Sequence, residues 1–224
     1  MNDSHIRRSG LAALLGGVLV VILPLLESYA FHGGTTIGWV VAARPIGEPL
    51  VRFARRFASA DEVLYVFGRP QAFAFLLLML GYIGLHARLS RHNGRVERLG
   101  YCLAVLALLL ALAGNIGDMW LGKYVWGTAN QWVAQLGGGL LLLGAVVLSA
   151  ASILIGVAIL RANAMPSWTA WLLIIAAIFS IPLALAFIQG LSAVYLLFGP
   201  AWIAVGYILW RGPSENTAEP DLSA

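Results

Sequence analysis

Residues 132–160 read WVAQLGGGLLLLGAVVLSAASILIGVAIL, an apolar segment without a charged side chain. A helix rises about 1.5 Å per residue, so roughly 20 apolar residues cross the hydrocarbon core of a bilayer. This segment is long enough to cross with tilt or with one end projecting into water. It therefore predicts a transmembrane helix and places the chain among membrane proteins.

Further apolar segments on both sides of this one meet or approach the same length. Backbone polar groups within lipid must be satisfied inside each segment, which favours helices. We therefore predict an all-α polytopic membrane protein with six transmembrane helices. The last two predicted spans are joined by only Gln189 and Gly190, so a broken or re-entrant segment is an alternative to a tight hairpin there. The predicted spans cover residues 11–31, 71–89, 99–121, 132–160, 168–188 and 191–210.

The composition of the chain agrees with a membrane bundle. Of the 224 residues, 60% are hydrophobic and 11% are charged, whereas an average soluble domain carries about a quarter charged residues. Cys102 is the only cysteine, so the sequence excludes an intramolecular disulfide and a cysteine-based metal cluster. We expect its thiol to be buried and inert. We predict no cofactor, and no nucleic-acid partner, because the arginines form no continuous groove.

Basic residues near the ends of the spans indicate the orientation, since cytoplasmic loops are rich in arginine and lysine. We predict a protein of the plasma (inner) membrane with both termini in the cytoplasm. Residues 1–211 form the bundle, and residues 212–224 form a disordered cytoplasmic tail. In this orientation Arg7, Arg8, Arg88, Arg91, Arg95, Arg98, Arg161 and Arg211 lie inside, against Arg44, Arg52, Arg55, Arg56, Arg69 and Lys123 outside.

The first span also has the composition of a secretory signal peptide. A basic start and an apolar core lead to Ser28-Tyr29-Ala30, a small-x-small cleavage sequence. Cleavage after Ala30 would leave five spans. We expect an uncleaved anchor instead, because Glu27 lies within the span and needs polar partners elsewhere in the chain.

The connection at residues 32–70 is long enough to carry structure of its own. Its apolar residues recur at helical spacing and its arginines occupy the other side, with Pro49 suited to the first turn. This pattern predicts an extracytoplasmic amphipathic helix in the headgroup layer, which either only covers the bundle or binds anionic lipid or a protein partner. The apolar residues are Leu50, Phe53, Ala54 and Phe57, and the predicted lipid- or partner-binding residues are Arg52, Arg55 and Arg56.

Polar residues within the predicted spans gather near the outer side of the membrane. Such residues are costly in lipid and often mark functional sites. Asn115 and Asp118 are three apart and share a helix face, as do Gln131 and Gln135, four apart. We predict an outward-facing polar cluster that binds a ligand or locks the helices together, formed by Glu27, Asn115, Asp118, Gln131 and Gln135, with His32 and Lys123 at its rim.

Small residues predict where the helices approach one another most closely. Gly81 and Gly84 lie on the second predicted span, and Gly137, Gly144 and Gly156 lie on the fourth. An inverted repeat with helices broken at mid-membrane, which is typical of secondary transporters, is not evident in the sequence.

These observations favour a non-enzymatic membrane subunit that binds lipid or a partner protein through its outer face. The partner is membrane lipid, another protein or a second copy of the chain. We predict no catalytic residue and no metal site. One alternative is a small transporter or ligand carrier that uses the polar cluster, and another is a membrane metalloenzyme that uses Glu27, His32 and Asp118.

Overall fold

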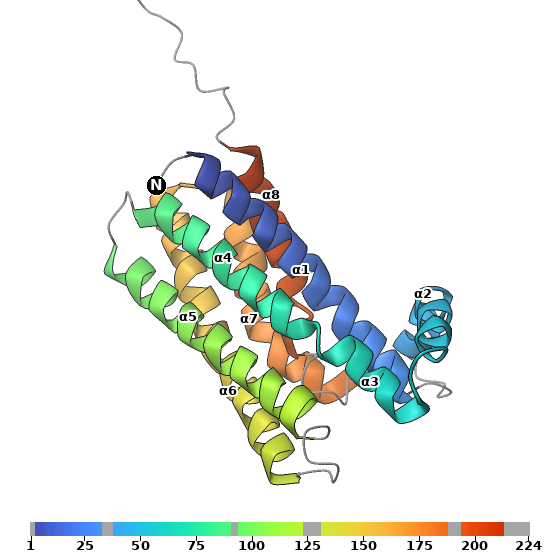
Figure 1. Cartoon of the computed structure of the whole chain (residues 1–224). Helices are drawn as coiled ribbons and strands as arrows, with labels where there is room; N and C mark the ends of the chain where they lie inside the picture. The colour runs from blue at the N-terminus through green and yellow to red at the C-terminus, as the bar shows by residue number, and fades with distance from the viewer. Residues whose placement is uncertain (1–2, 33–37, 91–93, 123–130, 188–193, 213–224) are drawn as a thin grey trace, which may run out of the picture.

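The computed structural model describes residues 3–32, 38–90, 94–122, 131–187 and 194–212, and these residues form helices and no strand. Figure 1 shows a bundle of helices with two further helices, α2 and α3, at one end. The predicted tail lies outside the described residues. The helices are α1 (Asp3–His32), α2 (Gly38–Ala54), α3 (Ala60–Gly68), α4 (Gln71–Leu89), α5 (Arg95–Asn115), the π-helix η2 (Ile116–Leu121), α6 (Gln131–Ala162), α7 (Ser167–Phe187) and α8 (Phe198–Arg211).

Four helical segments are long and apolar enough to cross a bilayer, which is consistent with an integral membrane protein. They are Ser4–Ala30, Tyr65–Leu89, Arg95–Leu121 and Trp132–Ala162, and they contain most of each of the first four predicted spans. The fifth and sixth predicted spans correspond to α7 and α8. Among the described residues, α7 offers a shorter apolar segment, Ser167–Pro182, and α8 has only 14 residues, so six crossings stay a prediction.

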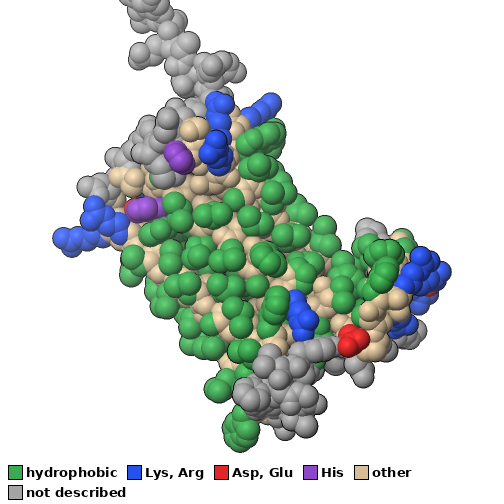
Figure 2. Space-filling model, viewed as in Figure 1, with side chains coloured by type: hydrophobic (Ala, Val, Ile, Leu, Met, Phe, Trp, Pro, Cys, Tyr) green, Lys and Arg blue, Asp and Glu red, His purple; other side chains and the backbone are tan. Residues whose placement is uncertain are grey.

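Helices α1, α4, α5, α6, α7 and α8 pack in a closed ring. α1 contacts α4 and α8, α5 contacts α4 and α6, and α7 contacts α6 and α8. The first and last helices of the bundle are therefore neighbours. Figure 2 shows hydrophobic side chains covering the flank of the bundle, while arginines gather toward its ends. A lipid-facing surface has this distribution.

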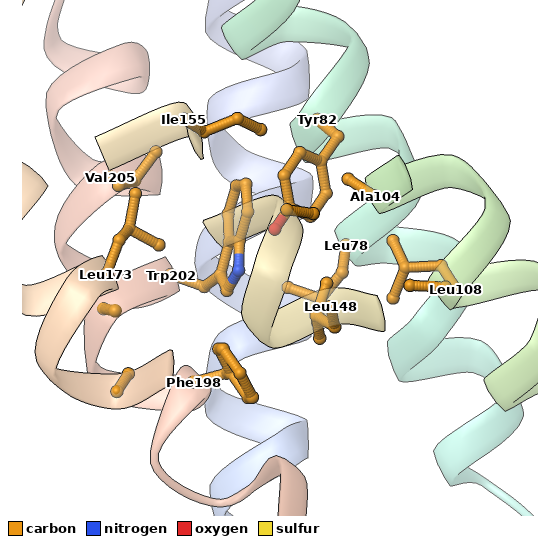
Figure 3. Packing of buried hydrophobic residues seen from close by; sticks show 14 of the residues in the cluster. Leu78, Tyr82, Ala104, Leu108, Leu148, Ile155, Leu173, Phe198, Trp202 and Val205 are labelled. Carbon is orange, nitrogen blue, oxygen red and sulfur yellow. The ribbon is translucent and has the colours of Figure 1, made fainter. Parts of the chain in front are cut away.

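Aromatic side chains fill the centre of the bundle. Tyr82 of α4 packs on Trp202 of α8, with ring centroids 4.1 Å apart, and Figure 3 shows this pair beside Leu78 and Leu148. Tyr195 packs edge-on against Phe75 at 4.9 Å. The Tyr195 hydroxyl donates to the carbonyl of Leu141 at 2.7 Å, so its polar end is satisfied.

Glycines allow the close helix contacts that the sequence predicts. A Cβ atom on Gly81 would lie 2.6 Å from Cβ of Ala13, and one on Gly144 would lie 2.9 Å from the carbonyl oxygen of Ala107. Real Cβ atoms do not approach other atoms this closely, so α4 packs on α1, and α5 on α6, only because these positions are glycines.

The contact between α1 and α8 also depends on glycines, which no sequence pattern had singled out. Gly10 and Gly17 of α1 face Gly206 and Gly199 of α8. A Cβ on Gly206 would lie 2.7 Å from the carbonyl oxygen of Gly10, and one on Gly17 would lie 2.8 Å from that of Gly199. The two backbones are therefore in direct contact along most of α8.

Three local predictions differ from the structure. The amphipathic helix begins at Gly38, and Pro49 lies inside it. The last helix begins at Phe198 rather than near residue 191, because residues 194–197 form a short 3-10 segment and a turn. Cys102 is exposed on α5, since its face of the helix points away from the bundle. Helix α3 and the π-helical form of η2 were not predicted.

Candidate functional site

The α2 end of the bundle is the end where α1 and α5 finish and α4 and α6 begin (Figure 1). Residues 68–71 connect α3 to α4. Three of these four residues form hydrogen bonds, each to a different helix: α1, α5 or η2. These residues lie between α1 on one side and α5 with η2 on the other. Two of these bonds involve predicted polar residues, Glu27 and Asn115.

Gln71, at the start of α4, bonds to Glu27 of α1. Its Nε2 donates to Oε2 of Glu27, and both side chains are buried. A buried carboxylate without donors is expensive, so this bond removes part of the cost of placing Glu27 inside the protein. The contact explains how an acidic residue is tolerated near the end of an apolar helix.

Asn115, at the end of α5, reaches the same connection from the other side. Its Nδ2 donates to the carbonyl of Gly68 at 3.0 Å, and the side chain is fully buried. Its Oδ1 has no hydrogen-bond partner among the described residues. This buried oxygen could therefore still accept a hydrogen bond from a donor that reaches the interior.

Arg69 adds a third link, to the π-helix. Its Nε donates to the carbonyl of Met119 at 3.2 Å, and its guanidinium lies 5.3 Å from the ring centre of Trp120. A π-helical turn has one extra residue, and here the Gly122 amide donates to the carbonyl of Gly117 at 2.8 Å. Such turns occur frequently at functional sites.

The structure thus connects Glu27 and Asn115 to one short segment, but not to each other directly. Asp118 lies half-buried on η2, and it has no hydrogen bond or ion pair with another described residue. Gln135 is exposed on α6. The side chains of Gln131 and His32, and all of Lys123, lie outside what the structure describes. The polar cluster as a single site therefore stays a prediction.

The described side chains contain no group of three or more His, Cys, Asp and Glu residues placed to hold a metal ion. The alternative set of Glu27, His32 and Asp118 includes a side chain beyond the described residues. What the geometry does show is that the Glu27 carboxylate already accepts a hydrogen bond from an amide.

Helix α2 docks on the bundle through small and apolar residues. Gly47 lies against the ring of Tyr29, where a Cβ would be 2.8 Å from Cγ. Val51 and Ala54 are buried in a small apolar cluster with residues of α1 and α3, including Leu26 and Val63. The docking face therefore shares only Ala54 with the apolar face that the sequence predicts for this helix.

Apart from Ala54, the predicted apolar residues of this segment point away from the bundle. Phe53 is 57% exposed and Phe57 is 78% exposed, and their rings pack edge to face at 5.2 Å. Leu50 is also exposed. Exposed aromatic rings beside arginines are typical of a helix in contact with a membrane surface.

A groove of about 650 Å³ runs along the outward side of α2 and the turn after it. Arg44, Arg52 and Arg56 line it together with Phe53, and Glu48 binds Arg52 at 2.6 Å. Arg55 is exposed but does not line the groove. Figure 2 shows the basic side chains gathered on this part of the molecule.

Sequence reasoning missed three residues of this region. The sequence places Gln71 at the start of a span, and its amide is a donor near the depth of the predicted acidic residue Glu27. It shows Arg69 and Arg44 only as charges outside the membrane. The contacts of these three residues depend on how the connection between α1 and α4 folds back on the bundle. The helical periodicity of the sequence does not predict that fold.

No known family model matches the chain, and neither does any curated protein or solved structure.

Proposed function

We propose that the chain is a non-enzymatic membrane protein that binds anionic phospholipid headgroups through the groove on α2. The observation that carries this proposal is the convergence of Arg44, Arg52 and Arg56 on one groove at the end of an apolar bundle. Guanidinium groups donate several hydrogen bonds in a geometry that matches phosphate oxygens.

The aromatic residues favour lipid over a soluble acidic partner. Phe53 and Phe57 lie beside the arginines and are largely exposed. Water makes such exposure unfavourable, whereas an acyl-chain boundary accommodates it. The groove would hold the phosphate while the two rings enter the apolar layer next to it.

The Glu48–Arg52 ion pair orients the Arg52 side chain without cancelling the positive charge of the groove. Glu48 accepts from one of the three lining arginines, which leaves the other two side chains to meet an anion. Pairing across one helical turn holds the Arg52 head in place at little cost, because both side chains are partly solvated. A net positive groove results.

The experiment uses the full chain in nanodiscs, with phosphatidylglycerol titrated against phosphatidylcholine and retained lipid counted by native mass spectrometry. Combined substitution of Arg44, Arg52 and Arg56 by Gln should weaken phosphatidylglycerol binding about tenfold or more, since hydrogen bonds to charged groups contribute roughly 1.5–3 kcal/mol each. Added salt should weaken wild-type binding in the same direction.

Arg55→Gln is the matched control, because Arg55 is exposed on the same segment but does not line the groove. It should keep most of the wild-type affinity. Equal phosphatidylglycerol binding by the triple variant and the wild type would refute the proposal, and so would a loss of equal size in Arg55→Gln.

A further inference from the structure

A second cavity lies at the opposite end of the bundle, where α4 and α6 finish and α5 begins. Its volume is about 400 Å³. Leu89, Ala158 and Ala162 give it an apolar wall, and Arg95, Glu97 and Arg161 supply charged groups of both signs. This cavity shares no residue with the α2 groove, so a ligand bound in it is independent of lipid binding by α2.

Glu97 is the buried acidic group of the cavity, with 4% of its surface exposed. One carboxylate oxygen, Oε1, pairs with Nδ1 of His86 on α4, and the His86 ring stacks on Tyr101 at 4.2 Å between centroids. The other oxygen, Oε2, is buried and has no hydrogen-bond partner among the described residues. A buried carboxylate oxygen without a donor is costly, so a donor delivered by a ligand would be favourable here.

The positive side of the cavity is formed by two arginines. Arg95 and Arg161 are exposed, and neither has an acidic partner in the described part of the chain. They belong to different helices, α5 and α6, so they approach the cavity from two directions. Together they can hold an anion that a single arginine would leave partly solvated.

The start of α5 adds backbone donors to the same place. Gly94 precedes the helix, contributes no side-chain cap, and lines the cavity together with the first-turn residues Arg95, Val96 and Glu97. The first amide to bond back along the helix is that of Arg98, which donates to the carbonyl of Gly94 at 3.2 Å. The earlier amides have no partner within the helix, and helix starts of this kind bind phosphate.

We propose that this cavity binds an ammonium–phosphate zwitterion, the chemistry of a phosphoethanolamine headgroup. The phosphate lies between Arg95, Arg161 and the start of α5, and the primary ammonium pairs with the carboxylate of Glu97, a lining residue of the cavity. A simple anion would meet the Glu97 carboxylate, and a simple cation would meet two arginines. A ligand with both charges satisfies both sides.

This chemistry has two sources, a phosphatidylethanolamine headgroup and free phosphoethanolamine. The apolar wall beside the charged groups suits the glycerol and acyl part of a lipid. The test therefore offers both sources to the full chain, reconstituted without its native lipids, and follows binding by native mass spectrometry and by the shift in thermal unfolding.

The headgroup series tests the ammonium. In the triple variant of Arg44, Arg52 and Arg56, which lacks the proposed lipid groove on α2, phosphatidylethanolamine should bind about tenfold more tightly than phosphatidylcholine, whose quaternary ammonium has no N–H to donate, and than phosphatidylglycerol, which has no cation. Saturable binding of free phosphoethanolamine would assign the site to the soluble source, and binding of the lipid alone would assign it to the membrane. Equal affinity for all three lipids, without binding of free phosphoethanolamine, would overturn the proposal.

Two sets of variants separate the charges. Glu97→Gln should remove the preference for phosphatidylethanolamine over phosphatidylglycerol. In the same triple-variant background, Arg95→Gln combined with Arg161→Gln changes only exposed residues, so the protein should fold normally and lose affinity for all phosphate-bearing ligands by about tenfold or more. Arg8→Gln, an exposed arginine that does not line the cavity, is the control and should bind as the wild type does. Unchanged phosphatidylethanolamine binding by the double arginine variant would also overturn the proposal.

Discussion

Glu27 shows how the protein manages an acidic residue near the end of a 30-residue apolar helix. The hydrogen bond from Gln71 crosses from α4 to α1 and supplies the donor that lipid does not offer. Glu27 therefore helps to hold α1 against α4, as the apolar side chains around it do. The contribution of this bond can be measured because Gln71 is a neutral amide.

Replacing Gln71 by Leu should lower the free energy of unfolding by about 1–3 kcal/mol, because it removes the donor and leaves the Glu27 oxygen buried. Gln135→Leu is the matched control, since Gln135 is exposed on α6, and it should change stability little. Unfolding in mixed micelles measures both. Combining Gln71→Leu with Glu27→Gln should give a loss that differs from the sum by at least about 0.5 kcal/mol. An additive result would mean that the bond does not stabilise the fold.

The same kind of cycle asks whether the predicted polar residues form one site. Glu27→Gln combined with Asp118→Asn should also depart from additivity if both groups belong to one network. Strict additivity of these two substitutions would separate Asp118 from Glu27 and end the single-cluster interpretation. The direct bonds of Glu27 and Asn115 to the α3–α4 connection would be unaffected by that outcome.

Among the helices, the pairing of α1 with α8 depends on glycines spaced seven residues apart on each partner. Gly10 and Gly17 face Gly206 and Gly199, and the backbones touch. Lipid gives little apolar driving force between helices, so close packing of this kind is what holds such pairs together. The pairing also brings the Trp202 side chain of α8 onto Tyr82.

Gly206→Ala should destabilise the fold by roughly 1–3 kcal/mol, because its methyl group would overlap the backbone of α1 near Leu14 and Gly10. Gly139→Ala is the control: a Cβ there meets nothing within 4 Å, and alanine favours a helix over glycine. Thermal unfolding in detergent compares the two. A Gly206→Ala protein as stable as the control would show that the two helices can separate without loss.

Hydropathy was sufficient to predict most of the helices. The second span was predicted at residues 71–89, and α4 occupies Gln71–Leu89. The close approach at Gly81 and Gly144 also followed from residue size. The sequence did not predict which helices pack together, because a glycine on one helix does not indicate which other helix packs against it. The contacts of α8 with α1 therefore came only from the structure.

The candidate site was predictable in its residue types but not in its connections. Glu27 and Asn115 stood out as polar groups in apolar segments. The bonds that the structure shows for them run to an amide side chain and a backbone carbonyl, and neither carries a charge that a sequence scan would single out. The sequence also did not predict which face of α2 packs on the bundle. Ala54, one of the apolar residues named from the sequence, lies on that face together with Val51, whereas Phe53 and Phe57 point outward.

At the scale of the whole molecule, the arrangement of charges predicts how the chain lies in the membrane. Arg95 and Arg161 mark one end of the bundle, and Arg52 and Arg56 mark the other. After Cys102→Ser, single cysteines at Ser90 and Ser167 should react in intact cells only with membrane-permeant thiol reagents, whereas one at Ser59 should react with impermeant reagents. These three serines are exposed, so access depends on the side of the membrane.

A cysteine at Ser192, at the start of the predicted sixth span, extends this test to the hairpin that precedes it. With six crossings it should react with impermeant reagents, as the Ser59 position does. Protection of Ser192 together with labelling of Ser59 would leave the last two helices short of a full crossing. Labelling of Ser90 and Ser167 from outside would reverse the predicted orientation.

The adjacency of α1 and α8 also has a consequence for biosynthesis. A ribosome delivers α1 to the membrane first and α8 last, so the glycine-lined face of α1 has to wait for nearly the whole chain before its partner exists. During that interval its exposed backbone groove is available to insertion factors or to other nascent helices. Quality control of this protein is therefore expected to monitor the arrival of the final helix.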